Sequence, residues 1–397
     1  MASEINETLK EKYEATQQEF EKKIRRHRRA IMYRIVIGIA IAVALVISAY
    51  YNFQKMVYTD YDVIRSISYA EASNAKYLEF GTNVLRYSQD GASAFNISND
   101  MLWNETFEMQ NPIVDTCGDF VAIGDYMGTT IYIYNSEGLR GSIDTSTPLK
   151  RFCVSGNGNV AVVLEDDEVT WVKLYDVNGT NIASDRTTMS KSGYPVCIDI
   201  SEDGILLAVS YLFVDSGMLS TSVAFYNFGA VGQNEVDNLV SGYNYSGSVG
   251  SLVKFINPDT SIVVADNKFC IFKGKEKPES VFEKDIDEEI LSVFNNENQV
   301  ALVFEDDDGE NKFIVEVYDD KGNTVTTQGF DMDYSNITLY RDLLIINNSE
   351  ACQIYNTSGL KKFDGKFDKP SLAVIPETAG SRYLIVGADG MEEIKLK

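Results

Sequence analysis

The stretch "VKLYDVNG", residues 172–179, has the pattern of a strand that runs into a tight turn. Tyr175 ends the strand-like run, Asp176 follows it, and Gly179 comes after two more residues. An Asp or Asn side chain at such a place bonds the backbone of its own turn, and Gly supplies the positive φ that the turn needs. Four more tyrosines recur in this setting, each followed by Asp or Asn: Tyr134, Tyr226, Tyr318 and Tyr355.

Weaker copies of the pattern extend the series: Phe272 lies midway in the longest gap between these tyrosines, Phe95 lies one step upstream, and Ile394 lies one step downstream. Consecutive anchor residues lie 37 to 51 residues apart. A period of roughly 40–45 residues, with several short strands in each unit, is typical of β-propeller blades. The sequence therefore predicts an all-β, eight-bladed propeller. Seven blades is the alternative, if the first or the fifth repeat is misread.

The chain begins and ends out of phase with this repeat. The first unit starts at an inner strand, residues 77–80, and the last unit ends after its third strand, residues 392–396. One outer strand is missing, and the segment 60–68, "DYDVIRSIS", is left over. We expect this N-terminal strand to complete the last blade and close the ring, because closure removes exposed sheet edges.

A run of 19 residues without charge, 35–53, precedes the repeats. At about 1.5 Å per residue a helix of this length spans roughly 28 Å, close to the hydrocarbon thickness of a bilayer. A buried core helix or a cleaved signal peptide is the alternative, but the run has no polar face and carries aromatic residues at its end. The expected organisation is a cytoplasmic helical tail (1–34), a transmembrane helix (35–53), a linker (54–60) and a propeller (61–397).

Charge predicts the orientation of the span. The N-terminal flank carries six basic residues, which we expect at the cytoplasmic membrane surface: Lys22, Lys23, Arg25, Arg26, Arg28 and Arg29. Residues 1–34 have a net charge of +3 and the remainder has −27, from 26 Lys and Arg against 53 Asp and Glu. We therefore expect a single-pass cell-membrane protein with a cytoplasmic N-terminus and an extracytoplasmic propeller. So acidic a domain argues against nucleic acid as a partner.

Several kinds of catalytic and metal sites are missing from the sequence. The only histidine is His27, so the propeller has no Ser-His-Asp arrangement and no His metal ligand. The five cysteines include no CxxC pair, which argues against a disulfide framework. The acidic stretch 304–310 does not fit the EF-hand register. We expect no cofactor, no metal site and no enzymatic activity; a carboxylate-based hydrolase stays an alternative.

Blade geometry assigns the loops to faces. The acidic segments 164–168 and 304–310, the segment 211–222 and the long connection 229–250 are all expected on one face, pointing away from the membrane. Four aromatic residues of the last two segments are expected as exposed anchors for a protein partner: Tyr211, Phe213, Tyr243 and Tyr245. In the alternative interpretation, Tyr211 and Phe213 pack within blade four.

Several stretches resemble an uncharacterised family of membrane-anchored β-propeller proteins from anaerobic Gram-positive bacteria: "YLEFGTNVLRYSQDG" (77–91), "MSKSGYPVCIDISEDG" (189–204), "LAVSYLFVD" (207–215), "VAFYNFGAVGQNEVD" (223–237) and "EEIKLK" (392–397). The resemblance implies the same propeller and no activity or site residues. The sequence thus predicts a non-enzymatic protein-binding platform in the cell envelope. A receptor for a small ligand, glycan or cation is the first alternative.

Overall fold

The computed structural model describes residues 20, 22–23, 25–29, 31–46, 48, 56–68, 75–96, 100–166, 169–188, 192–306, 309–377, 382–387 and 390–397. The chain forms two compact units, Met1–Val57 and Tyr58–Lys397. The first contains one apolar helix, Arg25–Val46, long enough to cross a membrane, a property that signal sequences share. The predicted tail helix over residues 1–19 and the end of the predicted span, residues 49–53, lie outside the described residues.

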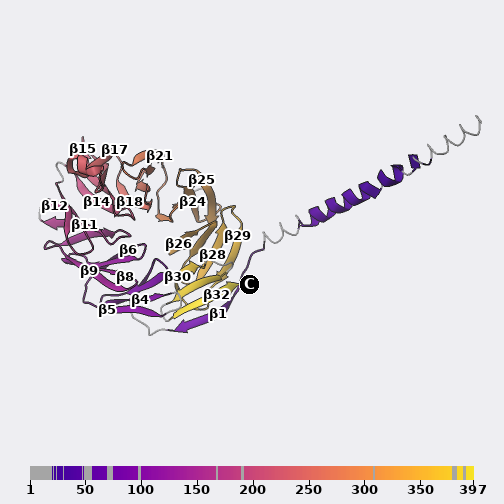
Figure 1. Cartoon of the computed structure of the whole chain (residues 1–397), viewed down its shortest axis with the longest axis horizontal. Helices are drawn as coiled ribbons and strands as arrows, with labels where there is room; N and C mark the ends of the chain where they lie inside the picture. Colours follow the sequence, from indigo (N-terminus) through magenta and orange to yellow (C-terminus); the bar gives the residue numbers. More distant parts are fainter. Residues whose placement is uncertain are drawn as a thin grey trace, which may run out of the picture. The chain divides into compact units, whose positions relative to one another are not determined.

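The described residues of the second unit form eight antiparallel sheets of four strands, arranged as the blades of a propeller (Figure 1). Within a blade we name the strands A to D from the centre of the ring outwards. The first four blades are β2 (Lys76–Phe80), β3 (Asn83–Tyr87), β4 (Gly91–Asn96) and β5 (Met101–Thr106); β6 (Pro112–Cys117), β7 (Phe120–Asp125), β8 (Thr130–Asn135) and β9 (Gly138–Asp144); β10 (Leu149–Val154), β11 (Val160–Asp166), β12 (Val169–Tyr175) and β13 (Asn181–Thr187); and β14 (Tyr194–Ile200), β15 (Leu206–Asp215), β16 (Met218–Asn227) and β17 (Leu239–Ser246).

The other four blades continue in the same order, except that the last one takes its outer strand from the start of the propeller. They are β18 (Gly250–Asn257), β19 (Thr260–Ala265), β20 (Lys268–Lys273) and β21 (Glu279–Asp285); β22 (Ser292–Asn295), β23 (Gln299–Glu305), β24 (Phe313–Asp319) and β25 (Thr324–Phe330); β26 (Asn336–Tyr340), β27 (Leu343–Asn347), β28 (Ala351–Asn356) and β29 (Lys361–Lys366); and β30 (Ser371–Pro376), β31 (Arg382–Gly387), β32 (Gly390–Leu396) and β1 (Tyr61–Ser68). The prediction of eight blades is confirmed.

The repeated turn forms as its residues predict. The Asp176 Oδ1 atom accepts hydrogen bonds from the backbone N–H groups of Asn178 (2.9 Å) and Thr180 (2.8 Å), and Gly179 has φ +79°. The anchor Tyr175 packs with apolar side chains of the preceding blade, such as Ile133. The apolar core therefore lies between blades, and burying one such side chain stabilises the fold by roughly 1.5–3 kcal/mol.

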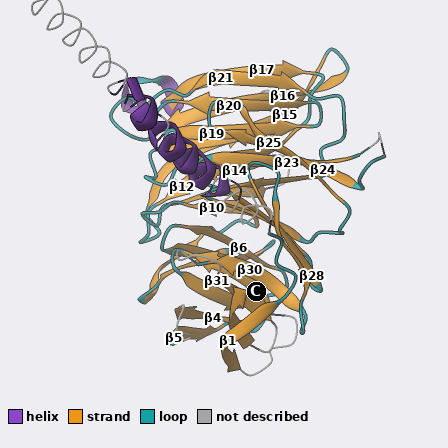
Figure 2. Cartoon of the chain, turned by 90° about the vertical axis from the view of Figure 1, so that its right-hand side faces the viewer, coloured by secondary structure: helices purple, strands orange, loops and turns teal. Residues whose placement is uncertain are grey.

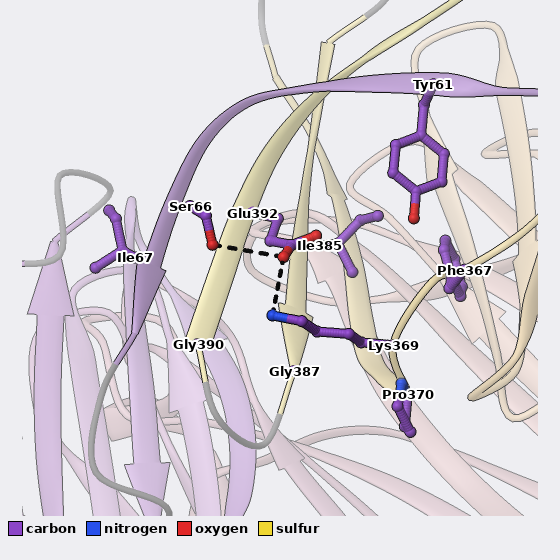
Figure 3. Close-up of a pocket in the computed structure, with 10 residues that line it drawn as sticks. All are labelled: Tyr61, Ser66, Ile67, Phe367, Lys369, Pro370, Ile385, Gly387, Gly390 and Glu392. Carbon is purple, nitrogen blue, oxygen red and sulfur yellow. Dashed lines mark hydrogen bonds and ion pairs between the residues drawn. The ribbon is translucent and has the colours of Figure 1, made fainter.

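The ring closes as the leftover strand predicts. β1 pairs antiparallel with β32, from Tyr61 opposite Leu396 to Ser68 opposite Gly390. Figure 3 shows Ser66 and Lys369 pointing toward Glu392; their distances to Glu392 Oε1 are 3.4 and 3.2 Å. The cavity here is about 20 Å³, enough for one water molecule. The cavity is therefore a small gap where the ring closes and not a ligand site.

The turns of each blade divide between two faces of the ring. We call the face with the B–C turns and the links between blades the BC face, and the opposite face, with the A–B and C–D turns, the CD face. β32 is a C strand and ends at the CD face with Leu396, opposite Tyr61. The chain thus enters β1 from the CD face. Just before β1, the Tyr58 N–H donates to the carbonyl of Lys362 at 2.9 Å.

Candidate functional site

Three of the four aromatic residues predicted as exposed anchors, Tyr211, Tyr243 and Tyr245, pack against apolar clusters between blades. Tyr211 is 3% exposed, and its hydroxyl lies 2.9 Å from that of Tyr226. The Tyr243 hydroxyl donates to the Pro278 carbonyl at 3.0 Å, and that of Tyr245 donates to Glu283 Oε1 at 3.4 Å. Phe213, Tyr243 and Tyr245 are half-buried. The predicted exposure is wrong for Tyr211, because blade 4 buries it against blade 3. Tyr243 and Tyr245 pack partly against the boundary with blade 5, and Phe213 keeps part of its surface exposed.

The segment 211–222 is a hairpin rather than a long loop. β15 and β16 pair along their whole length, up to Asp215 opposite Met218, and only Ser216 and Gly217 form the turn. Both turn residues have positive φ, +50° and +87°, as in the two-residue turns that join β-hairpins. Figure 2 shows β15, β16 and β17 side by side as long strands. The hairpin therefore presents a stiff tip on the BC face.

Three large apolar side chains are exposed at this tip: Val214 (61%), Leu219 (48%) and Met218 (54%). Val214 and Leu219 are opposite each other on the two strands. We call these three residues the hairpin tip. Large exposed apolar side chains that gather on a rigid element are typical of protein contacts, whereas scattered ones are ordinary.

The long connection 229–250 divides between the two faces. Residues 229–238 follow the C strand β16 and include two short 3₁₀ helices, η1 (Gly232–Asn234) and η2 (Val236–Asn238), so they lie on the CD face. Only residues 247–249 lie on the BC face, between β17 and β18. The expectation that the whole connection shares one face with the acidic turns is therefore wrong. Those acidic turns, β11–β12 and β23–β24, do lie on the BC face; residues 167–168 and 307–308 within them are outside the described residues.

The insertion at 229–238 borders a groove between blades 3 and 4, with a cavity of about 210 Å³. Asp185 of β13 lies in it, and its Oδ2 atom accepts hydrogen bonds from the hydroxyls of Tyr226 (3.4 Å) and Tyr211 (3.5 Å). Asp237 and Asn238 of the insertion also line the groove. Burial raises the pKa of Asp185, and the nearby Asp237 carboxylate raises it further.

A second polar cluster lies at the inner strands of blades 2 to 5. Asp199 is buried, 3.7 Å from the Lys254 ammonium, and its Oδ2 atom accepts the Phe255 N–H at 2.6 Å. Burial raises the pKa of Asp199 to about 7, although the charge of Lys254 opposes this. Asp115 likewise accepts the N–H of Val154, on the next blade, at 2.8 Å. The Asp115 and Asp199 carboxyls therefore bridge neighbouring blades. A cavity of about 200 Å³ lies beside Asp199 and Lys254.

On the other side of the ring, the inner strands of blades 6 to 8 line a cavity of about 470 Å³ with Glu79. Its polar walls include Asn295, Asn336 and Thr338. In the part of the chain that the structure describes, no three His, Cys, Asp or Glu residues gather as metal ligands.

The sequence does not predict Asp185, Asp199 and Lys254 as site residues. Asp199 and Lys254 do leave a signal, because each interrupts an otherwise apolar inner strand, in "VCIDI" and "LVKF". Asp185 leaves none, because it belongs to a polar outer strand in which alternate positions face solvent.

Comparison with known proteins agrees with the fold. No curated protein matches this chain. Among solved structures, Sqt1 from Chaetomium thermophilum is 14% identical with a TM-score of 0.53, over 85% of this chain and 98% of that one. BamB from Moraxella catarrhalis is 11% identical with a TM-score of 0.50, over 85% of this chain and 100% of that one. At such identities the likeness shows the fold alone.

A family model covers nearly the whole propeller and the segment before it. The match extends over residues 54–396. The match supports the predicted resemblance to an uncharacterised propeller family. The chain belongs to the family of unknown function DUF5711.

Proposed function

We propose that this protein is a non-enzymatic protein-binding platform of the cell envelope. In this proposal the helix Arg25–Val46 anchors the chain in the cell membrane with the N-terminus in the cytoplasm, and the propeller lies outside the membrane. The observation that carries it is the hairpin tip. Val214, Met218 and Leu219 are exposed on the longest hairpin among the described B–C pairs of strands.

The hairpin tip has the properties of a contact site for a protein. Its backbone is held by the paired strands β15 and β16, so little conformational entropy is lost when a partner binds. Burying apolar surface against a partner contributes about 25 cal/mol per Å². A few buried apolar anchors at the centre of an interface commonly supply most of the binding energy.

The chain path supports an outward-facing hairpin tip. The segment that follows the helix enters the ring at the CD face, at Tyr61. The hairpin tip is on the opposite, BC face. A propeller anchored through β1 would then present the hairpin tip away from the membrane surface.

The test is photocrosslinking in living cells, with a photoreactive residue in place of Met218. The control position is Leu139, at the start of β9 on the CD face, which is 53% exposed against 54% for Met218. One dominant protein adduct from position 218 and none from 139 supports the proposal. Equal adducts from both positions, or none from 218, contradict it.

The cavity at the inner strands of blades 6 to 8 favours a second candidate function, a receptor for a small ligand, glycan or cation. The observation is the cavity of about 470 Å³ at the inner strands of blades 6 to 8, which is lined by amide and hydroxyl side chains. Saturable binding of a small molecule that is lost in Asn336→Leu, together with no adduct at position 218, would favour this receptor over the platform.

A further inference from the structure

We propose that the groove between blades 3 and 4 binds an organic cation, an alkylammonium or guanidinium group that carries an apolar stem. The groove is the cavity of about 210 Å³ lined by residues of β12, β13 and β16 and by the insertion at 229–238. A single water molecule needs only about 10–15 Å³ of such volume, so the groove has room for a ligand of side-chain size. It is separate from the hairpin tip, because it opens beside the CD-face insertion.

Among the described residues, the Asp185 carboxylate of the groove has no ion-pair partner. The Asp185 Oδ2 atom faces the hydroxyls of Tyr211 and Tyr226. No Lys or Arg in the part of the chain that the structure describes lies within ion-pair distance of Asp185 or of Asp237, whereas the part-buried Glu316 is paired with Lys284 at 2.9 Å. Lys173 also lines the groove, but its ammonium lies over the Trp171 ring, 5.4 Å from the ring centroid. A partly buried carboxylate is costly unless a counter-charge compensates it. An incoming ammonium or guanidinium would supply that charge.

The walls of the groove favour a cation with a hydrocarbon stem. Leu174, Ile182 and Phe228 line it. The side chain of Ile182 is exposed, and Phe228 packs against the buried core of blades 3 and 4. A stem of a few methylene groups would cover this surface, and each buried methylene contributes about 0.8 kcal/mol on transfer from water.

The insertion places a second carboxylate at the groove. Asp237 and Asn238 both have left-handed backbone conformations, with φ +54° and +60°. The Asn238 side-chain amide donates to the carbonyl of Asn227 at 3.2 Å, which ties the insertion to the end of β16. Asp237 lines the same groove as Asp185, so both carboxylates attract a cation that binds there.

Two carboxylates and hydroxyl groups suit an organic cation better than a metal ion. Ca²⁺ takes about 6–8 oxygen ligands, and Mg²⁺ requires a near-octahedral set. The apolar walls offer such an ion nothing, but they contact an alkyl stem. Anions are repelled by the same two carboxylates.

The test is calorimetric titration of the full-length protein in detergent micelles with butylammonium and with butylguanidinium chloride. We expect one saturable site, with affinity reduced at least about tenfold in Asp185→Asn, because a charge-assisted hydrogen bond is lost. The amide retains an oxygen that accepts the two tyrosine hydroxyls. Asp237→Asn should weaken binding less. Asp287→Asn, the same change at an exposed position on the link between blades 5 and 6, should leave it unaltered.

Two further titrations distinguish a cationic side chain of a partner protein from a small cationic metabolite. Short peptides that carry one Lys or Arg are titrated beside the free amines; binding of peptides indicates a partner's side chain, and binding of free amines alone indicates a small metabolite. Absence of saturable binding of every cation, equal affinity in wild type and Asp185→Asn, or displacement of butylammonium by equimolar CaCl₂ would each overturn the proposal. The melting temperature of Asp185→Asn is measured as a control. If it equals that of the wild type, a lost calorimetric signal reflects lost binding and not loss of the fold.

Discussion

Asp199 of β14 and Lys254 of β18 face each other across the boundary between blades 4 and 5, with 3.7 Å between Oδ1 and Nζ. That separation is longer than a hydrogen bond. The other carboxyl oxygen accepts the Phe255 N–H at 2.6 Å. Burial outweighs the attraction of Lys254 and raises the pKa of Asp199 to about 7. The folded chain therefore holds a proton on Asp199 at pH values where the unfolded chain has lost it.

This proton makes stability depend on pH. Below a pH of about 4, Asp199 is protonated in both states; between about 4 and 7 the folded state binds more protons, so its free energy of unfolding falls as pH rises. One pKa unit corresponds to about 1.4 kcal/mol, and the whole fall from this residue is on the order of 4 kcal/mol. Asp199→Asn keeps an oxygen for the Phe255 N–H and should remove this fall. Urea unfolding at about pH 5 and about pH 8 measures it, and an unchanged difference between the two pH values in the variant would contradict the assignment.

The propeller itself was predictable because its signal is local. Asp176 bonds the backbone of its own turn, so the turn can be recognised from five residues, and its recurrence gives the number of blades. The closure of the ring was predictable because the last repeat lacks an outer strand and the segment 60–68 is left over. The partner anchors were not predictable in the same way, because in blade 4 both sheet faces are covered by neighbouring blades. Tyr211 and Tyr243 are therefore packed. The sequence around Tyr243 alternates as in a half-exposed strand, whereas Tyr211 belongs to the largely apolar run 206–214.

The groove between blades 3 and 4 is formed by residues that are far apart in the sequence, so no local sequence pattern predicts it. Tyr226 was recognised as a turn anchor, but its hydroxyl reaches Asp185, which is 41 residues earlier in the chain. The 229–238 insertion has no repeat to align with, so its face could be assigned only once the position of β17 was known.

Closure of the ring should depend on Tyr61. Its side chain is buried with residues of blades 7 and 8, and its hydroxyl accepts the Asp368 N–H at 3.0 Å. We expect Tyr61→Ala to lower the free energy of unfolding by about 3–5 kcal/mol, and Tyr61→Phe by about 1 kcal/mol. Val63→Ala on the same strand, where Val63 is 45% exposed, should change it by less than about 0.5 kcal/mol. Chemical denaturation measures all three, and equal effects of Tyr61→Ala and Val63→Ala would show that this strand does not hold the ring.

The cysteines should stay reduced and unreactive in the folded protein. All five are free, and burial raises the pKa of each thiol, to about 12 for Cys117 and about 11 for Cys270. The thiolate is the reactive form, so alkylation by iodoacetamide at about pH 8 should be slow in the native protein and fast after unfolding. Intact-mass analysis counts the adducts. Rapid modification of one cysteine in the native state would mean that its strand opens locally.

The Gly of the repeated turn should be required for two reasons. It adopts the left-handed backbone conformation of the turn, and its lack of a side chain lets the neighbouring blade approach closely. Gly322 and Gly309 have nearly the same φ, +84° and +82°, but a Cβ at Gly322 would overlap the Phe282 ring of blade 5. Among the described residues, no atom lies within 4 Å of a Cβ at Gly309. Gly309→Ala should therefore cost only left-handed strain, about 1–2 kcal/mol. Gly322→Ala should cost about 1–3 kcal/mol more, because it overpacks the boundary between blades 5 and 6.

The double variant Gly322→Ala, Phe282→Ala separates the two effects. If overlap with the ring causes the extra loss, adding Gly322→Ala to Phe282→Ala should cost no more than Gly309→Ala does in the wild type. Urea unfolding of the four variants gives these differences. Equal costs of the two single glycine substitutions would show that the turn conformation alone selects Gly. A larger cost at Gly322 that Phe282→Ala removes would show that the turn also sets how closely one blade packs on the next.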